Sequence, residues 1–103
     1  MERFHERYDL LVTPTLAITA FEAGRNTPAG GKWGDDWVGW TPFTYPFNLS
    51  YQPGSSCPAG FSKDGLPIGL QIVARAGADA LVLRASRAFE SARAFRMCEG
   101  LKP

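Results

Sequence analysis

Two adjacent serines and a lysine are the first residues in this sequence whose types suggest chemistry. Ser55 and Ser56 lie in "PGSSCPAG", and Lys63 follows shortly after them. A serine hydroxyl becomes a nucleophile when a base lies beside it, and a buried lysine can serve as that base. Here the serines fall in a predicted strand beside Gly and Pro, and the lysine falls in a predicted turn. We therefore expect structural serines and no catalytic residue in this chain.

Phosphate binding and metal binding are not supported by the other candidate motifs. The segment "GGKW", residues 30–33, lacks the longer glycine spacing and the following Ser or Thr of a phosphate-binding loop. The cysteines Cys57 and Cys98 and the only histidine, His5, form no group with metal-ligand spacing. We expect no metal and no cofactor, with both cysteines acting as small buried hydrophobic residues.

The aromatic residues in the middle of the chain are better candidates for binding. Residues 17–40 lack periodicity but hold all three tryptophans: Trp33, Trp37 and Trp40. Linkers avoid large aromatic residues, so this loop is expected to pack over a pocket or over another part of a larger protein. In "GWTPFTYPF", which follows, Pro42 is expected to open a short helix that Pro46 limits.

Composition limits the class of protein and its partners. The chain has 103 residues, of which 45% are hydrophobic and 20% charged, and its net charge is +1. These values are ordinary for one globular domain. A basic stripe and a run of about 18 apolar residues are both lacking, and the start "MERFHERYD" is polar. We expect no nucleic-acid partner, no membrane insertion and a cytoplasmic location.

Patterning predicts a short set of elements that would position these residues. Residues 1–8 are typical of a helix end, and residues 10–13 of a short buried strand that Pro14 stops. Residues 55–61 and 66–73 form two strands joined by "SKDG", in which Asp-Gly is a strong turn signal. An antiparallel hairpin is therefore expected.

The second hairpin strand has two unlike faces. With a period of two, its aliphatic face carries Leu66, Ile68, Leu70 and Ile72. The other face, which is small or polar, carries Pro67, Gly69, Gln71 and Val73. The first face suits a core, and the second suits the close approach of another backbone or helix. Pro67 must begin the strand or lie at an edge, because it cannot donate a ladder hydrogen bond.

An amphipathic helix of about four turns is expected at the end of the chain. Asp79 takes the N-cap position after Gly77. The inward stripe of this helix is expected to hold Leu81, Ala85, Ala88, Phe89 and Ala92.

Four segments together resemble the amidase signature enzymes. They are "YDLLVTPT", "FNLSYQPGSSCPAGF", "DGLPIGLQIV" and "ADALVLRASRAFE". The resemblance implies an α/β fold in which a mixed sheet is layered with helices, and makes residues 1–103 the C-terminal segment of a single amidase signature domain. Its activity would be hydrolysis of a carboxylic amide C–N bond by a serine, a second serine in a cis peptide and a lysine. None of these three has a counterpart here, so the isolated chain is expected to be inactive.

The resemblance also points to a substrate site and to partners. In the family, the region before the Asn-Leu element helps to form the substrate cleft, which here gives Trp37, Trp40, Thr41, Phe43 and Thr44. Aromatic walls with hydroxyls suit an apolar or aryl amide. The alternative is that these aromatic residues only fill the interior under a long loop. The expected partners are a small-molecule amide and the rest of the amidase domain, or a second copy of the chain.

Two residues depart from the family pattern, and two other functions are alternatives. Tyr51 stands where the family has glycine, and Gly54 where a larger apolar residue is common. A tyrosine tolerates positive φ poorly, which puts the turn at this point in doubt. Within the family, the chain could instead be a segment of the amidotransferase component that supplies ammonia for glutaminyl-tRNA. Outside it, the alternative is a non-catalytic packing or assembly module from a truncated or split gene.

Overall fold

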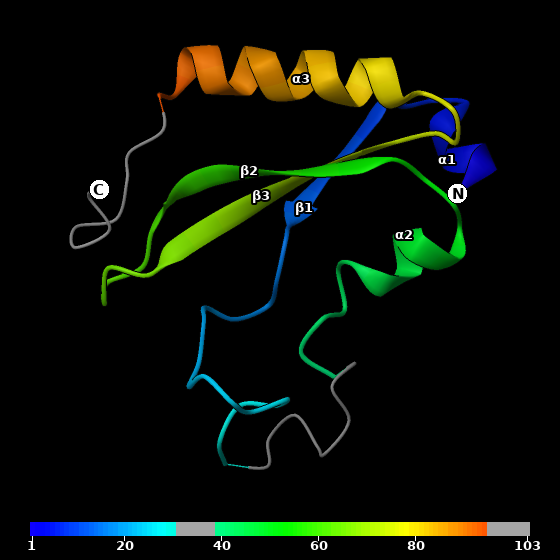
Figure 1. Cartoon of the computed structure of the whole chain (residues 1–103). Helices are drawn as coiled ribbons and strands as arrows, with labels where there is room; N and C mark the ends of the chain where they lie inside the picture. Colours follow the sequence, from blue (N-terminus) through cyan, green and yellow to red (C-terminus); the bar gives the residue numbers. More distant parts are fainter. Residues whose placement is uncertain (31–38, 95–103) are drawn as a thin grey trace.

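The computed structural model describes residues 1–30 and 39–94. A three-stranded sheet separates a long helix from a layer made of a short helix and loops (Figure 1). The elements in chain order are α1 (Glu2–His5), β1 (Leu10–Pro14), α2 (Tyr45–Leu49), β2 (Gly54–Phe61), β3 (Pro67–Ala74) and α3 (Asp79–Ala92).

The predicted antiparallel hairpin is confirmed as β2 and β3. Its turn closes through a hydrogen bond of 2.8 Å from the Ser62 N–H to the Leu66 carbonyl, and Gly65 has a φ of 76°. The strand order is β1-β3-β2, so β3 lies in the centre. Both pairings are antiparallel. Parallel pairs, which a mixed sheet would add, are thus not found among residues 1–30 and 39–94.

Pro67 begins β3, as its missing N–H requires. At this end β3 pairs with β2 alone, because β1 pairs with β3 only from Leu70 to Ala74. The described sheet is therefore three strands wide at the Ala74 end and two strands wide at the Pro67 end.

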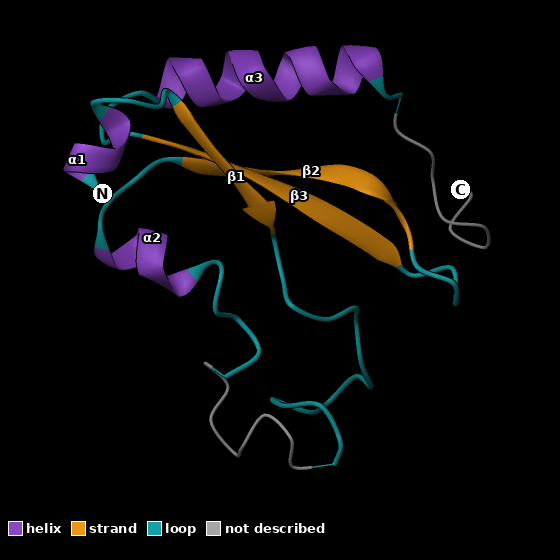
Figure 2. Cartoon of the chain, turned by 180° about the vertical axis from the view of Figure 1, so that it is seen from behind, coloured by secondary structure: helices purple, strands orange, loops and turns teal. Residues whose placement is uncertain are grey.

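Helix α3 packs along one side of the sheet, which we call the helix face and define by Ser55, Cys57, Leu70 and Ile72 (Figure 2). Cys57 and Ile72 are buried there, as is Val82 of the helix. The predicted aliphatic stripe is only partly a core, because Leu66 and Leu70 are half-buried and Ile68 is 41% exposed. The aliphatic stripe becomes more exposed toward Pro67, where β1 no longer pairs with β3.

The predicted length of α3 is confirmed, but two of its details are wrong. Ala78, and not Asp79, is the N-cap residue, and no side chain caps this end. Asp79 is instead the first helical residue, where its charge still complements the positive end of the helix dipole. Ala88 and Ala92 are exposed, and the buried position is Val82. The inward stripe is therefore rotated by a fraction of a turn from the alanine-rich line.

The opposite side of the sheet, the cleft face, is defined by Ser56, Gly69, Gln71 and Val73. Figure 1 shows α2 and the loop that follows β1 on this side, away from α3. The helix expected at Pro42 is wrong: α2 begins at Tyr45 and carries Pro46 in its first turn. Proline fits there because the first N–H groups of a helix have no partner inside it.

Tyr51 confirms the doubt about the turn that leads from α2 into β2. It has a φ of 52°, the only positive value among the described residues other than glycine, and its side chain is 87% exposed. A left-handed conformation costs a residue with a Cβ about 1–2 kcal/mol. Gly54, the other departure, begins β2, and a Cβ added there would meet only ordinary contacts at 3.6 and 3.7 Å.

Gln52 ties the N-terminal helix to the central strand. Its Nε2 donates to the Ala74 carbonyl at 2.9 Å and lies 2.8 Å from His5 Nε2. His5 Nδ1 lies 3.0 Å from the Tyr8 carbonyl oxygen. If Nδ1 carries the proton, Nε2 accepts from Gln52 and both ring nitrogens are used, so the histidine has a structural part here. Among the described helices, none is long and apolar enough to cross a membrane.

Candidate functional site

A cavity of about 530 Å³ opens on the cleft face at the narrow end of the sheet. One wall is the chain that leaves β1, residues 15–20, and the floor comes from the hairpin. The hairpin residues that line it are Ser56, Pro58, Pro67, Ile68 and Gly69. The cavity exists at this place because β1 ends at Pro14 while β2 and β3 continue.

Two hydroxyl groups meet above the backbone of Gly69 at the floor of this cavity. Thr15 Oγ1 and Ser56 Oγ lie 2.6 Å apart, and the Thr15 N–H donates to the Gly69 carbonyl at 2.9 Å. A Cβ on residue 69 would lie 2.6 Å from Thr15 Oγ1 and 2.7 Å from Ser56 Oγ. Heavy atoms this close would clash, so glycine is what lets the hydroxyls approach across the central strand.

The two serines of the apparent Ser-Ser-Lys motif lie on opposite faces of the sheet. Ser56 pairs with Thr15 in the cavity, whereas Ser55 Oγ lies 2.7 Å from Ser86 Oγ of α3. Lys63 is exposed in the hairpin turn. A hydroxyl is not a base, so neither contact activates a serine as a nucleophile. This arrangement can bind and orient a ligand, but it offers no acyl-transfer chemistry by itself.

Gln71 was not predicted as a site residue, yet it connects the cleft face to the segment before α2. Its side chain is buried, and Nε2 donates to Phe43 O at 2.6 Å and to Thr13 Oγ1 at 3.0 Å. The amide therefore holds β1, β3 and the Phe43 backbone together. A glutamine at a position otherwise occupied by small or apolar residues is the signal in the sequence that pointed to this role.

The predicted substrate-binding residues fall into three situations. Trp37 lies outside the described residues. Trp40 packs edge-to-face on Phe21 with 5.2 Å between ring centroids, and its Nε1 donates to the Asn26 carbonyl at 3.0 Å. Thr41 is buried, and Thr44 donates back to its carbonyl through both N and Oγ1.

Trp40, Thr41, Phe43 and Thr44 thus sit on one continuous stretch, but the 530 Å³ cavity is lined by other residues. What joins the two places is the cleft face, through Gln71 and the Phe43 carbonyl. The sequence-based selection missed Thr15, Ser56 and Gly69. Gly69 carried a signal, since a glycine inside a strand marks a close approach.

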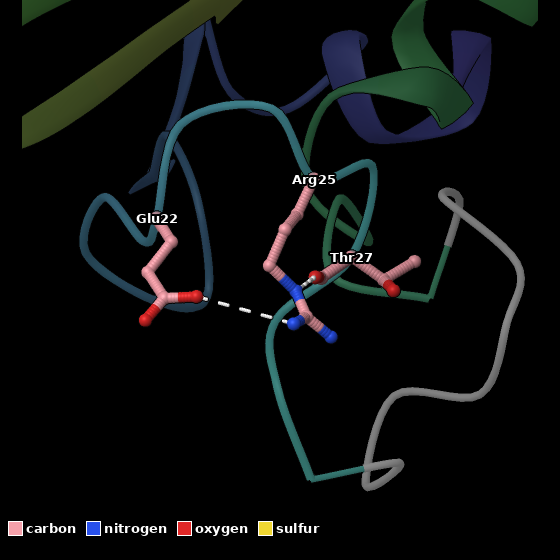
Figure 3. A network of polar contacts seen from close by, with 3 residues as sticks. All are labelled: Glu22, Arg25 and Thr27. Carbon is pink, nitrogen blue, oxygen red and sulfur yellow. Dashed lines mark hydrogen bonds and ion pairs between the residues drawn. The ribbon is translucent and has the colours of Figure 1, made fainter.

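The loop beside Trp40 is held mainly by aromatic packing and backbone contacts. Arg25 donates through Nε to the Thr27 carbonyl at 3.3 Å, and its Nη1 lies 3.9 Å from Glu22 Oε2 (Figure 3). Both charged side chains are exposed, so this ion pair contributes little to stability. Within the described ranges, no group of three His, Cys, Asp or Glu side chains could hold a metal ion.

Comparisons with known proteins agree on one family. The family model described as Amidase matches residues 1–83. An acylamidase from Rhodococcus erythropolis is 44% identical over 93 residues, which are 87% of this chain and 19% of that protein. The A component of the glutamyl-tRNA(Gln) amidotransferase from Brevibacillus brevis is 43% identical over 88 residues, 85% of this chain and 17% of that protein.

A solved structure supports the same relationship. A bacterial aryl acylamidase described as belonging to the amidase signature enzymes superposes with a TM-score of 0.74 at 38% identity. The match covers 92% of this chain and 20% of that one. The chain therefore spans about a fifth of the length of the relatives it matches.

Proposed function

Because this chain belongs to the amidase signature family, we propose that it is the C-terminal segment of an amide hydrolase. In this proposal residues 1–103 are part of a single amidase domain and supply core strands and one side of its substrate cleft. The catalytic serine, the bridging serine and the lysine belong to the rest of that domain. The reaction is hydrolysis of a carboxylic amide C–N bond.

The observation that carries the proposal is the bond from Gln71 to the Phe43 carbonyl. This hydrogen bond of 2.6 Å fixes the segment from Trp40 to Thr44 against the cleft face of the sheet. A backbone held by a buried amide is a rigid support for side chains that contact a ligand. We therefore keep Trp37, Trp40, Thr41, Phe43 and Thr44 as the proposed substrate-binding residues.

Exposed apolar side chains support a place within a larger domain. Leu49, Leu83 and Val12 are 75%, 68% and 53% exposed. Such residues are expected to be covered by the rest of the amidase domain, or by a second copy when the chain is expressed alone.

A segment of a glutamyl-tRNA(Gln) amidotransferase is the second candidate, because one such protein is 43% identical. The two candidates differ in substrate. The amidotransferase must bind glutamine, which is zwitterionic, whereas an acylamidase-like enzyme binds an apolar amide. The proposed substrate-binding stretch holds the aromatic residues Trp40 and Phe43 and no charged residue between Trp40 and Thr44, which favours the apolar amide.

The test uses a full-length enzyme that contains this segment. Replacing Trp40 with Ala should change the ratio of kcat/KM for an anilide to that for an aliphatic amide about tenfold, since a pocket contact contributes about 1–3 kcal/mol to discrimination. Burst formation of the acyl-enzyme should persist. Leu83→Ala, in an exposed residue of α3, is the matched control. An unchanged ratio in the Trp40 variant, or hydrolysis of glutamine in preference to both amides, would refute the proposal.

A further inference from the structure

We propose that Gln71 is a positioning residue for substrate discrimination, because its side-chain amide holds the Trp40–Thr44 segment in a fixed place relative to the end of β1. The inference rests on the proposed function in one respect, namely that this segment contacts the substrate. It assigns the selectivity of that contact to a buried side chain outside the segment.

The partners of the Gln71 amide determine its orientation. The Phe43 carbonyl oxygen, 2.6 Å away, can only accept a hydrogen bond, so the atom that faces it must be Nε2. Thr13 Oγ1 lies 3.0 Å from the same nitrogen and donates its own hydrogen to the Pro14 carbonyl at 3.0 Å. It must therefore accept from Gln71. Both hydrogens of Nε2 are used, and a reversed amide would place Oε1 against the Phe43 oxygen.

Thr13 holds this amide from the neighbouring strand. Thr13 and Gln71 are directly paired between β1 and β3, and such pairs have Cβ atoms about 4.5–5.5 Å apart. The terminal torsion of a glutamine is otherwise broad, so a second bond to Nε2 restricts the plane of the amide. The direction in which Gln71 donates to Phe43 is therefore set by β1.

Burial makes the bond to Phe43 resist displacement. Gln71 is only 7% exposed. If the Phe43 carbonyl moved away, a buried N–H would lose its partner, and an unpaired buried donor costs more than the bond contributes in net stability. The segment before α2 is thus kept at the place where this donor is satisfied.

The held segment has internal structure of its own. Thr44 donates to the Thr41 carbonyl through N and through Oγ1, both at 3.2 Å. Loss of the Gln71 bond should therefore shift the Thr41–Thr44 turn as a unit and not unfold it. A misplacement of about 1 Å in a group that positions a substrate can change a rate about 100-fold. The expected consequence is a change in substrate preference.

Gln71→Met, made in a full-length enzyme that contains this segment, removes both donors and keeps a long unbranched side chain. The ratio of kcat/KM for an anilide to that for an aliphatic amide should change about tenfold, mostly through KM. Fluorophosphonate labelling of the catalytic serine counts the folded enzyme and should proceed at a rate within about twofold of the unchanged enzyme.

Gln52→Met is the matched control, because Gln52 donates to the Ala74 carbonyl at 2.9 Å instead of to this segment. It should leave the ratio unchanged. Hydrogen–deuterium exchange reports on the same bond without turnover. A peptide that covers residues 40–44 should exchange faster in Gln71→Met than in Gln52→Met, since the lost bond permits local opening.

Two variants at Thr13 test the second bond of the amide and decide the matter even if Gln71→Met does not fold. Valine keeps the shape of threonine without the hydroxyl, whereas serine keeps the hydroxyl. Thr13→Val should shift the ratio in the same direction as Gln71→Met but only about threefold, a fraction of the effect of one hydrogen bond on the segment. Thr13→Ser should retain the original ratio.

Three results would overturn the inference: an unchanged ratio in Gln71→Met, an equal change in Gln52→Met, or equal ratios in the two Thr13 variants. Its failure differs from that of the proposed function. If Trp40→Ala shifts the ratio and Gln71→Met does not, the proposed function stands and this inference fails. If the full-length enzyme hydrolyses no amide, the proposed function fails, and exchange in residues 40–44 still decides whether Gln71 holds the segment.

Discussion

Ser55 and Ser56 are neighbours in β2, yet the two faces of the sheet give their hydroxyls different surroundings. On the helix face, Ser55 bonds to Ser86 beneath α3, next to buried Cys57 and Ile72. On the cleft face, Ser56 bonds to Thr15 over Gly69 at the edge of a cavity. The same side chain serves packing on one face and is available to a ligand on the other. Residue type alone therefore does not assign a role, and the alternation of the strand does.

The two faces also differ in how they are covered. The helix face is covered by α3, a regular helix that packs on it through aliphatic side chains. This packing is stable to small changes in the loops. The cleft face is covered by loops and a five-residue helix that Gln71 and Gln52 attach through hydrogen bonds. Irregular cover held by specific polar bonds is usual where a fold carries a binding site.

The largest expected effect is on the helix face. Ile72→Ala should lower the free energy of unfolding by about 2–5 kcal/mol, because Ile72 is 4% exposed and its removal leaves a cavity under α3. Ile68→Ala, in the same strand but 41% exposed, should cost less than half as much. Urea unfolding measures both. Equal losses of unfolding free energy in the two variants would show that the helix face of β3 is as well packed near Pro67 as it is near Ala74.

A substitution at Gly69 tests the close approach on the cleft face. Gly69→Ala should destabilise the chain by about 1–3 kcal/mol, because the Cβ would overlap the hydroxyls of Thr15 and Ser56. Gly54→Ala is the matched control in β2, where contacts of 3.6 Å accept a methyl group and the change should be neutral or stabilising. Thermal unfolding of both variants decides the point, and a stable Gly69 variant would contradict the described geometry.

Much of this contrast was predictable from local pattern. The hairpin, its turn and the strand start at Pro67 follow from Asp-Gly, from alternation and from the missing N–H of proline. The prediction of which residues of α3 face the sheet was wrong in part. Ala88 and Ala92 are small enough to suit either side, so periodicity alone did not determine the rotation of the helix. The predicted start of α2 was wrong because Pro42 and Pro46 are both prolines that could occupy the first turn of a helix.

The candidate site was less predictable than the fold. Gly69 and Gln71 were recognised as unusual in a strand, but their partners Thr15 and Phe43 are distant in sequence. Which residues meet across β3 depends on strand order and register, and the sequence pattern does not contain these. The selection of Trp40, Thr41, Phe43 and Thr44 came from the family resemblance and stays a prediction.

The turn at Tyr51 connects α2, which lies on the cleft face, to β2. A substitution in this turn should stabilise the fold. Tyr51→Gly should raise the free energy of unfolding by about 1 kcal/mol, because glycine adopts a φ of 52° without a steric penalty. Tyr51→Ala keeps the Cβ and should give no gain. Urea denaturation distinguishes the two, and an equal gain in both variants would assign the effect to the exposed aromatic ring.

The smallest expected effect separates the two serines by stability. Ser55→Ala should cost about 1 kcal/mol, since it removes a part-buried hydrogen bond between β2 and α3. Ser56→Ala should change stability by less than about 0.5 kcal/mol, because its hydroxyl is exposed. Parallel thermal melts measure the difference. A larger loss from the Ser56 variant would give this hydroxyl a structural role.

The most direct test of the central claim, that this segment binds but does not catalyse, is labelling of the purified chain with a fluorophosphonate. This reagent reacts with serines that a neighbouring base activates. The hydroxyl partners of Ser55 and Ser56 are Ser86 and Thr15, so we predict no labelling above that of the unfolded chain. Stoichiometric labelling that disappears in Ser55→Ala or Ser56→Ala would contradict the account and would place a catalytic nucleophile within these 103 residues.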